Sequence, residues 1–145
     1  MSLFSSLSVS ASGMSAQRTR AELLVENLAN AETTRTAEGG PYRRKDAVFT
    51  ATPLINPFSS VLDAELAQPV QGVTIGEVTV DDREPEQRYL PGHPDADAKG
   101  YVAFPRINPA EDMVDLMGAS RGYQANIAAM TAVKDMIQKS IDLLR

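Results

Sequence analysis

The sequence predicts an α+β fold, with long N- and C-terminal helices that pair as a coiled-coil-like bundle and a small β-rich, loop-rich middle domain. All nine prolines lie between Pro41 and Pro109, and six of the nine glycines lie between Gly39 and Gly100. Because proline breaks helices and glycine weakens them, long helices are confined to the two flanks. Apolar residues recur every seven positions in the flanks but alternate in the middle. We divide the chain into an N-terminal helix (1–34), a middle domain (35–106) and a C-terminal helix (107–145).

The N-terminal flank is expected to form a helix of low intrinsic stability. Leu7, Met14, Ala21 and Leu28 are spaced by seven residues. Gly13 and the neighbouring serines lower the helix propensity, each by up to about 1 kcal/mol relative to alanine. We therefore expect this segment to fray in the isolated chain. The same small residues would let a neighbouring helix approach closely.

The middle of the chain is expected to consist of turns and short strands. Residues 73–80 alternate between apolar and polar side chains, with a phase slip at Gly76 that suits a β-bulge. Ala47–Thr50 and Tyr101–Phe104 are further strand candidates. Ser59–Ala67 is a candidate short helix.

The C-terminal flank carries the clearest helix signal. Asn108 can cap the helix, Pro109 suits its first position, and Glu111 stands where a capping-box carboxylate would. The pattern resembles a coiled-coil stripe with polar interruptions. The apolar row is Leu116, Tyr123, Met130, Ile137 and Leu144, and the companion row is Met113, Ser120, Ile127, Lys134 and Ile141.

Composition excludes several classes of function. The net charge of −5 disfavours nucleic-acid binding, because an acidic chain gains nothing from counterion release. The absence of cysteine removes disulfides, thiolate zinc sites and thiol catalysis. No apolar run approaches the ~20 residues of a membrane span. Seven of the first fifteen residues are serine and the first charge is Arg18, so we expect no cleavable signal peptide.

One segment, His93–Asp97, resembles a metal or acid–base site, since it holds the sole histidine and two carboxylates. The prolines on either side of His93 favour a turn, and Asp95 can fold back on nearby backbone amides. No catalytic residue, cofactor or metal ligand is therefore predicted. An enzyme that uses a metal at His93 is kept as an alternative.

The two helices suggest assembly, because narrow apolar stripes on long helices cannot be buried fully against each other. Periodicity alone leaves a self-contained helical hairpin with a β insert equally open. The candidate contact residues are Leu7, Met14, Leu28, Asn30, Met113, Leu116, Tyr123, Asn126, Ile127, Met130, Ile137 and Leu144.

Specific motifs favour an assembling protein over a self-contained hairpin. Gly13–Arg18 and Glu26–Thr34 resemble the N-terminal signature that flagellar rod, hook and hook-associated proteins share. Narrower motifs resemble the proximal rod family, FlgC. These are Gly39–Lys45, Pro91–Asp97 continuing into Gly100–Val102, Asp112–Asp115, and Ala119–Asn126. Arg106 and Asp112 depart from the usual Asn and Glu of that family, and Thr52–Gln71 resembles nothing familiar.

The resemblance implies a structural subunit of the proximal rod of the bacterial flagellar basal body. Such a subunit assembles helically, transmits torque and lines the export channel. The implied partners are other copies, other rod subunits, the flagellar type III export apparatus and the base of the basal body, with neither nucleic acid nor membrane insertion. The implied location is the periplasmic part of the basal body, reached without a cleavable signal. The alternatives are another axial subunit and a non-structural export adaptor.

Overall fold

The computed structural model describes residues 3–54 and 70–143, and it confirms the α+β class. Within these residues, one long helix precedes four strands in the chain and another follows them. In chain order the elements are α1 (Leu3–Ala29), β1 (Lys45–Pro53), β2 (Gln71–Val80), β3 (Glu86–Tyr89), β4 (Tyr101–Phe104) and α3 (Pro109–Asp142).

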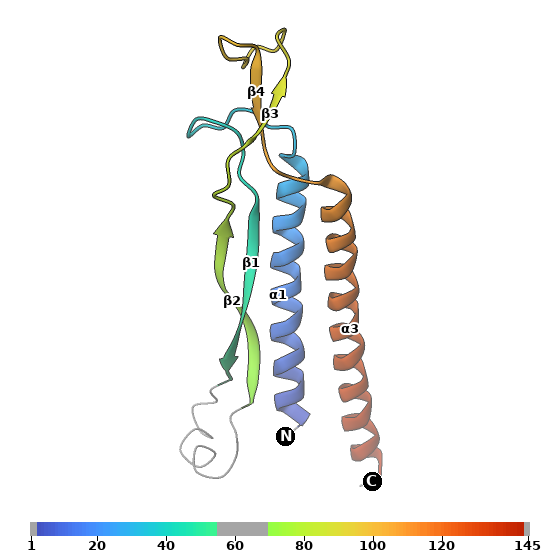
Figure 1. Ribbon diagram of the computed structural model, residues 1–145. Coiled ribbons are helices and arrows are strands. Elements are labelled where there is room, and N and C mark those ends of the chain that lie inside the picture. Colours follow the sequence, from blue (N-terminus) through green and yellow to red (C-terminus); the bar gives the residue numbers. More distant parts are fainter. Residues whose placement is uncertain (1–2, 55–69, 144–145) are drawn as a thin grey trace.

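The long elements lie side by side, with α1 between the β1–β2 hairpin and α3 (Figure 1). The chain rises along α1 and returns along α3, so the two helices are antiparallel and their free ends lie at the same end of the molecule. The β3–β4 hairpin projects beyond the opposite end. We call the end that carries the chain termini the terminal end, and the region where α1 ends and α3 begins the junction end.

The β1–β2 hairpin contains the predicted bulge. Val48 pairs with Glu77 and Phe49 pairs with Ile75, so Gly76 is the extra residue of β2. A Cβ atom at Gly76 would overlap the Thr50 hydroxyl. Glycine at this position is therefore required by the close approach of the two strands.

The Asn108 cap and the Pro109 position at the start of α3 also agree with the sequence prediction. Asn108 has an extended backbone, its side chain accepts a hydrogen bond from the backbone N–H of Ala110, and Pro109 occupies the first helical position. Glu111 and Asp112 lie in the first turn, where carboxylates interact favourably with the helix dipole.

The second hairpin was predicted only in part. Tyr101–Phe104 forms β4, as expected, but its partner β3 was missed. All four residues of β3 are exposed, so they show no apolar alternation. Val102 and Phe104 of β4 are buried, and the Phe104 ring contacts His93 and Arg88 within the same hairpin.

Buried side chains concentrate near the junction end. Leu24 and Asn27 of α1, Tyr42, Val102, and Asp112 in the first turn of α3 are buried there, whereas Ala16 and Val133 are the buried helix residues nearer the terminal end. The predicted helix at Ser59–Ala67 lies outside the described residues. No helix in the described ranges is long and apolar enough to cross a bilayer.

Candidate assembly surfaces and the junction that orients them

Asn27 joins the end of α1 to the start of β1. Its side chain is fully buried. The amide Nδ2 donates a hydrogen bond to the Lys45 carbonyl oxygen at 2.8 Å. Its Oδ1 accepts from the Lys45 backbone N–H at 2.9 Å and from the Tyr42 hydroxyl at 3.0 Å. Because each polar group has a partner, this buried amide fixes where the hairpin leaves α1.

Two neighbouring groups reinforce this contact. The Lys45 ammonium lies 2.6 Å from a carboxylate oxygen of Glu26, one residue before Asn27. Burial, followed by the charge of Glu26, raises the pKa of the Tyr42 phenol to about 12. Tyr42 therefore stays protonated at neutral pH and keeps donating to Asn27.

An ionic cluster joins the start of β1 to the first turns of α3. The Arg44 guanidinium lies 3.1 Å from Asp112, whose carboxylate is fully buried, and 3.3 Å from Asp46. Neither Asp112 oxygen accepts a hydrogen bond, so its pairing with Arg44 is mainly Coulombic. Burial raises the pKa of the Asp112 carboxyl, and the charge of Arg44 opposes that rise. From α1, Arg20 lies 3.4 Å from Asp115, which adds a third element to the cluster.

Small residues bring α1 and α3 close together between the junction and terminal ends. A Cβ atom at Gly13 would lie 2.9 Å from the Asn126 side chain, and one at Gly122 would lie 3.1 Å from Gln17. Each glycine on one helix thus accommodates an amide side chain of the other. Asn126 is held in place by donating to the Gly122 carbonyl oxygen at 2.9 Å.

The buried face of α3 is offset by one residue from part of the predicted stripe. Asp112, Ala119 and Val133 are buried, whereas Met113, Ile127 and Ile141 of the companion row are exposed. The physical reason is that the ion pair to Arg44 and the close approach at Gly122 select the face with acidic and small residues. The larger apolar side chains of the companion row consequently face outwards.

Large apolar side chains are therefore left exposed along α3. Val114 is 68% exposed, Met117 57% and Met113 53%. On α1, Phe4 is 74% exposed. Exposed apolar side chains that lie this close together along one element are typical of surfaces that bind another protein.

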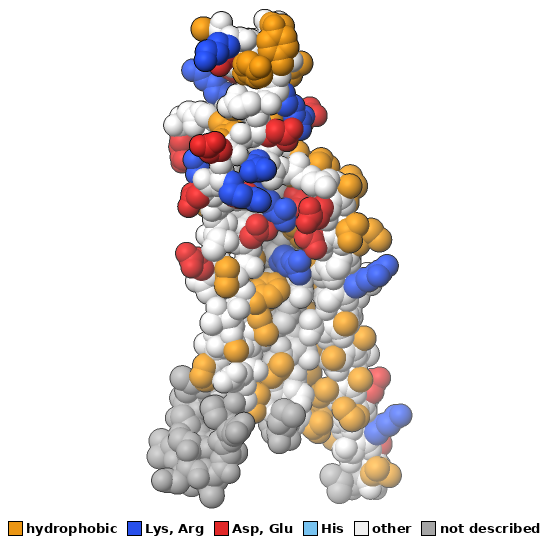
Figure 2. All heavy atoms as spheres, viewed as in Figure 1, with side chains coloured by type: hydrophobic (Ala, Val, Ile, Leu, Met, Phe, Trp, Pro, Cys, Tyr) orange, Lys and Arg blue, Asp and Glu red, His pale blue; other side chains and the backbone are white. Residues whose placement is uncertain are grey.

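Charge is distributed unevenly along the molecule. Charged side chains gather near the junction end on the face drawn in Figure 2, and apolar and uncharged side chains dominate below them. Near the terminal end the sequence explains this difference. Residues 3–17, 47–54, 70–76 and 122–133 contain no Asp, Glu, Lys or Arg. A neutral surface can be covered by another protein without stripping water from charges.

The predicted contact residues divide into two groups. Those partly buried within the chain are Leu7, Met14, Leu28, Asn30, Leu116, Asn126, Met130 and Ile137, and those exposed are Met113, Tyr123 and Ile127. Leu144 lies outside the described residues. Asn30 has a local role, since its side chain donates to the Glu26 carbonyl oxygen and accepts from Thr33. Whether these residues contact other subunits stays a prediction.

The segment around His93 forms a tied turn. His93 Nδ1 accepts a hydrogen bond from the Asp95 backbone N–H, and Asp95 accepts one from the Thr34 hydroxyl at 2.8 Å. Asp97 accepts from the backbone N–H groups of Lys99 and Tyr101. Among the described residues, no group of three or more His, Asp and Glu side chains could hold a metal ion.

Sequence reasoning missed the junction itself. Asn27 and Arg44 lay inside motifs that were noted only for their resemblance, and Asp112 was noted only as a departure from the family. A signal was available for one of them. An asparagine among the apolar residues of an amphipathic helix is a candidate for a buried hydrogen-bonded amide.

The comparisons with known proteins first define the class. Residues 98–143 match the family model described as flagellar basal body rod FlgEFG protein C-terminal. The matched residues include β4 and the whole of α3. The described class is that of flagellar basal-body rod proteins.

Relatives then define the particular family. The chain is 39% identical over 150 residues to the flagellar basal-body rod protein FlgC of Bacillus subtilis, with 99% of each chain covered. It is 37% identical over 155 residues to the protein of the same name from Borreliella burgdorferi, with 100% of this chain and 99% of the relative covered. The FlgC protein of Salmonella typhimurium is 37% identical, with 99% of this chain and 98% of the relative covered. The chain belongs to the FlgC family of flagellar basal-body rod proteins.

Proposed function

We propose that this chain is a structural subunit of the proximal rod of the bacterial flagellar basal body. In this proposal, the two terminal segments, residues 1–34 and 107–145, form the shaft, and the middle domain, residues 35–106, lies outside it. The shaft assembles helically, transmits torque and lines the channel through which later subunits are exported.

The observation that carries the proposal is the unpartnered apolar surface of α3. Met113, Val114 and Met117 are each more than half exposed, and Ile127 is 44% exposed. Burying one such side chain completely stabilises a contact by about 1.5–3 kcal/mol, so several of them support a stable interface. Helices of neighbouring subunits, packed as a coiled-coil-like bundle, would cover this surface.

The junction suits a protein that carries mechanical load. The buried Asn27 amide and the Arg44–Asp112 pair tie α1, the β1–β2 hairpin and α3 together at one end. A torque applied to the helices would thus be transmitted to the hairpin through hydrogen bonds and ion pairs. In the proposal the contacts with other rod subunits and with the base of the basal body use the remaining, exposed surfaces.

The proposal also includes the route of export and the location of the chain. The serine-rich start of α1 has a low helix propensity, which eases passage of the unfolded chain through the flagellar type III export apparatus. We infer that the chain reaches the periplasmic part of the basal body without a cleavable signal peptide. No catalytic role, cofactor, nucleic acid or membrane insertion forms part of the proposal.

The proposal is tested by placing a charge on the exposed face of α3. Ile127→Asp should abolish swimming and remove the chain from purified hook–basal bodies, because a buried unpaired carboxylate opposes subunit packing. The circular dichroism spectrum of the isolated variant should match that of the parent, since Ile127 is exposed in the single chain. Gln87→Asp on β3 serves as the matched control, because it adds the same charge outside α3.

The outcomes separate the alternatives. Normal swimming of the Ile127→Asp strain, at normal protein levels, would overturn the proposal. A parent chain found only in the cytoplasm, bound to export components, would favour the export adaptor instead. A parent chain found in the hook or distal rod fraction of dissected particles would favour another axial position.

A further inference from the structure

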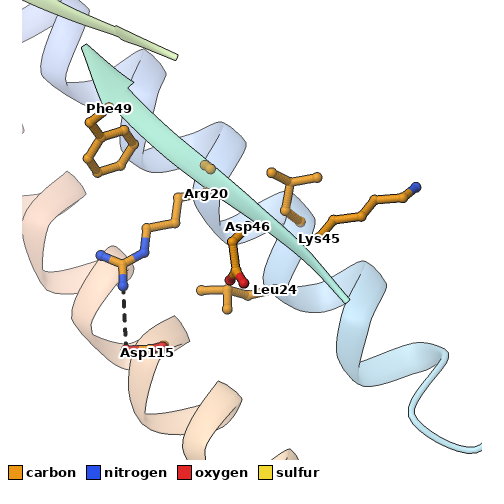
Figure 3. A pocket seen from close by; sticks show the side chains of 8 residues that line it. Arg20, Leu24, Lys45, Asp46, Phe49 and Asp115 are labelled. Atoms are coloured by element: carbon orange, nitrogen blue, oxygen red, sulfur yellow. Dashed lines mark hydrogen bonds and ion pairs between the residues drawn. The ribbon is translucent and has the colours of Figure 1, made fainter. Parts of the chain in front are cut away.

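An open groove lies over α1, between β1 and α3, near the junction end (Figure 3). Its volume is about 160 Å³. The α1 residues Leu23 and Leu24 contribute to its lining, together with Phe49 of β1 and Asp115 of α3. The groove is therefore lined by all three long elements.

The polar groups at the groove are already occupied within the chain. Arg20 lies 3.4 Å from Asp115, and Lys45 lies 2.6 Å from Glu26. Asp46 is paired with Arg44 at 3.3 Å, yet its side chain remains 52% exposed. The Phe49 side chain is 38% exposed. The groove thus offers apolar contact area, and Asp46 is the more exposed of the two carboxylates that line it.

The same chain carries a ridge that complements this groove. Met113, Val114 and Met117 project from the side of α3 that faces away from α1, within one helical turn of the groove residue Asp115. Arg121 follows Met117 by one further turn, and it is exposed and forms no ion pair with any described residue. Groove and ridge therefore lie at the same level along α3, on different sides of the molecule.

We propose that the ridge of one copy of this chain inserts into the groove of the next copy, with Arg121 directed towards Asp46. Methionine side chains are flexible and fill shallow, irregular apolar grooves well. Because groove and ridge are two different surfaces of one chain, the contact is heterologous and can be repeated without closing a pair. The inference rests on the proposed rod function and specifies which surfaces of this chain meet.

The absence of cysteine from the chain allows a direct test. Ala47→Cys places a thiol in the groove, and Met117→Cys places one on the ridge. The two variants are expressed together in one strain, hook–basal bodies are purified, and disulfide formation is induced with copper phenanthroline. Peptide mass spectrometry then identifies the linked residues. Since the two cysteines are on separate molecules, any mixed disulfide reports a contact between copies.

We expect an Ala47→Cys to Met117→Cys disulfide as the dominant cross-link. The matched control pairs Met117→Cys with Glu38→Cys, an exposed position in the loop after α1, and should give at least tenfold less cross-link. If either groove or ridge variant fails to incorporate, Asp46→Cys with Val114→Cys replaces the pair. Incorporation without the mixed disulfide, or with linkage of the groove only to a different rod subunit, overturns the inference. Absence of the parent chain from the particles overturns the proposed function instead.

Discussion

At the scale of single residues, a few buried polar side chains decide how the long elements are oriented. Asn27 forms three hydrogen bonds across the junction, and two of its partners are backbone groups of Lys45. A backbone partner cannot move away when the side chain is lost. The hydrogen bonds of Asn27 therefore hold the start of β1 against the end of α1.

Replacing Asn27 with alanine should destabilise the isolated chain by at least about 2 kcal/mol, because it leaves the Lys45 backbone groups and the Tyr42 hydroxyl buried without partners. Urea unfolding followed by circular dichroism measures the change. Gln138→Ala on the exposed side of α3 is the control, and it should change the free energy of unfolding by less than ~0.5 kcal/mol. Equal effects of the two substitutions would show that the junction is not a stabilising contact.

The raised pKa of Tyr42 predicts that the stability of the folded chain falls at alkaline pH. Its pKa rises from about 10 to about 12 on folding, so the folded state holds the proton more tightly than the unfolded state. The contribution of the protonated Tyr42 phenol to the free energy of unfolding is present below pH 10 and is lost as the pH rises towards 12. Between pH 8 and pH 11 the parent chain should lose about 1.4 kcal/mol more than Tyr42→Phe, which has no phenol to ionise. Parallel losses in the two chains, measured by urea unfolding at both pH values, would contradict this assignment.

At the residue scale, contacts between neighbours in the sequence could be predicted, and contacts between residues far apart in the sequence could not. Asn108 caps the next few residues of the chain, so its role can be read from three neighbouring letters. Asn27 bonds to residues eighteen and fifteen positions away. Nothing in the periodicity of α1 specifies which segment will return to meet it.

At the scale of elements, the Arg44–Asp112 pair fastens the start of α3 to the start of β1. Arg44→Met should destabilise the chain by about 3–5 kcal/mol at pH 7, because Asp112 is left as a buried, unpaired charge. Combining it with Asp112→Leu should restore most of that loss. The effect of Arg44→Met should also shrink in acid, because burial raises the pKa of Asp112 and its protonated form needs no cation. The free energies of unfolding are measured with urea for the two single variants and the double variant. If the losses of the two single variants simply add in the double variant, Arg44 and Asp112 do not form a stabilising pair.

The glycines of the two helices give a second prediction for the elements. A Cβ atom at Gly118 would meet no neighbouring side chain within 4 Å, so Gly118→Ala should stabilise α3 by about 0.5–1 kcal/mol in the isolated chain. Gly13→Ala should lack this gain, because its Cβ would lie 2.9 Å from Asn126 and displace the side chain that holds the helices together. Thermal unfolding of both variants tests the difference. A gain of the same size in both would mean that α1 and α3 are not closely packed at Gly13.

The helices themselves could be predicted, but the contact between them could not. Heptad spacing located both helices, and the bulge at Gly76 followed from a phase slip in the alternation. The buried residues of α3 are instead Asp112, Ala119 and Val133. An ion pair and small side chains, and not the large apolar side chains, determine which face of α3 is buried. Both depend on which residues of α1 and β1 lie opposite α3.

At the scale of the whole molecule, the two ends of the chain differ in how they are stabilised. The junction end has a small core, buried hydrogen bonds and ion pairs. Towards the terminal end, the helices lack charged side chains over residues 3–17 and 122–133. Specific polar contacts therefore stabilise the junction end, whereas the terminal end presents a largely uncharged surface.

We conclude that this chain is a structural part of the rod. Quantitative mass spectrometry of hook–basal bodies purified from the source bacterium, with labelled peptides of this chain as standards, would test this conclusion. A rod subunit should be present at a fixed number of copies per particle, and that number should survive stripping of the filament and hook. A chain missing from intact particles, while abundant in the same cells, would contradict the claim.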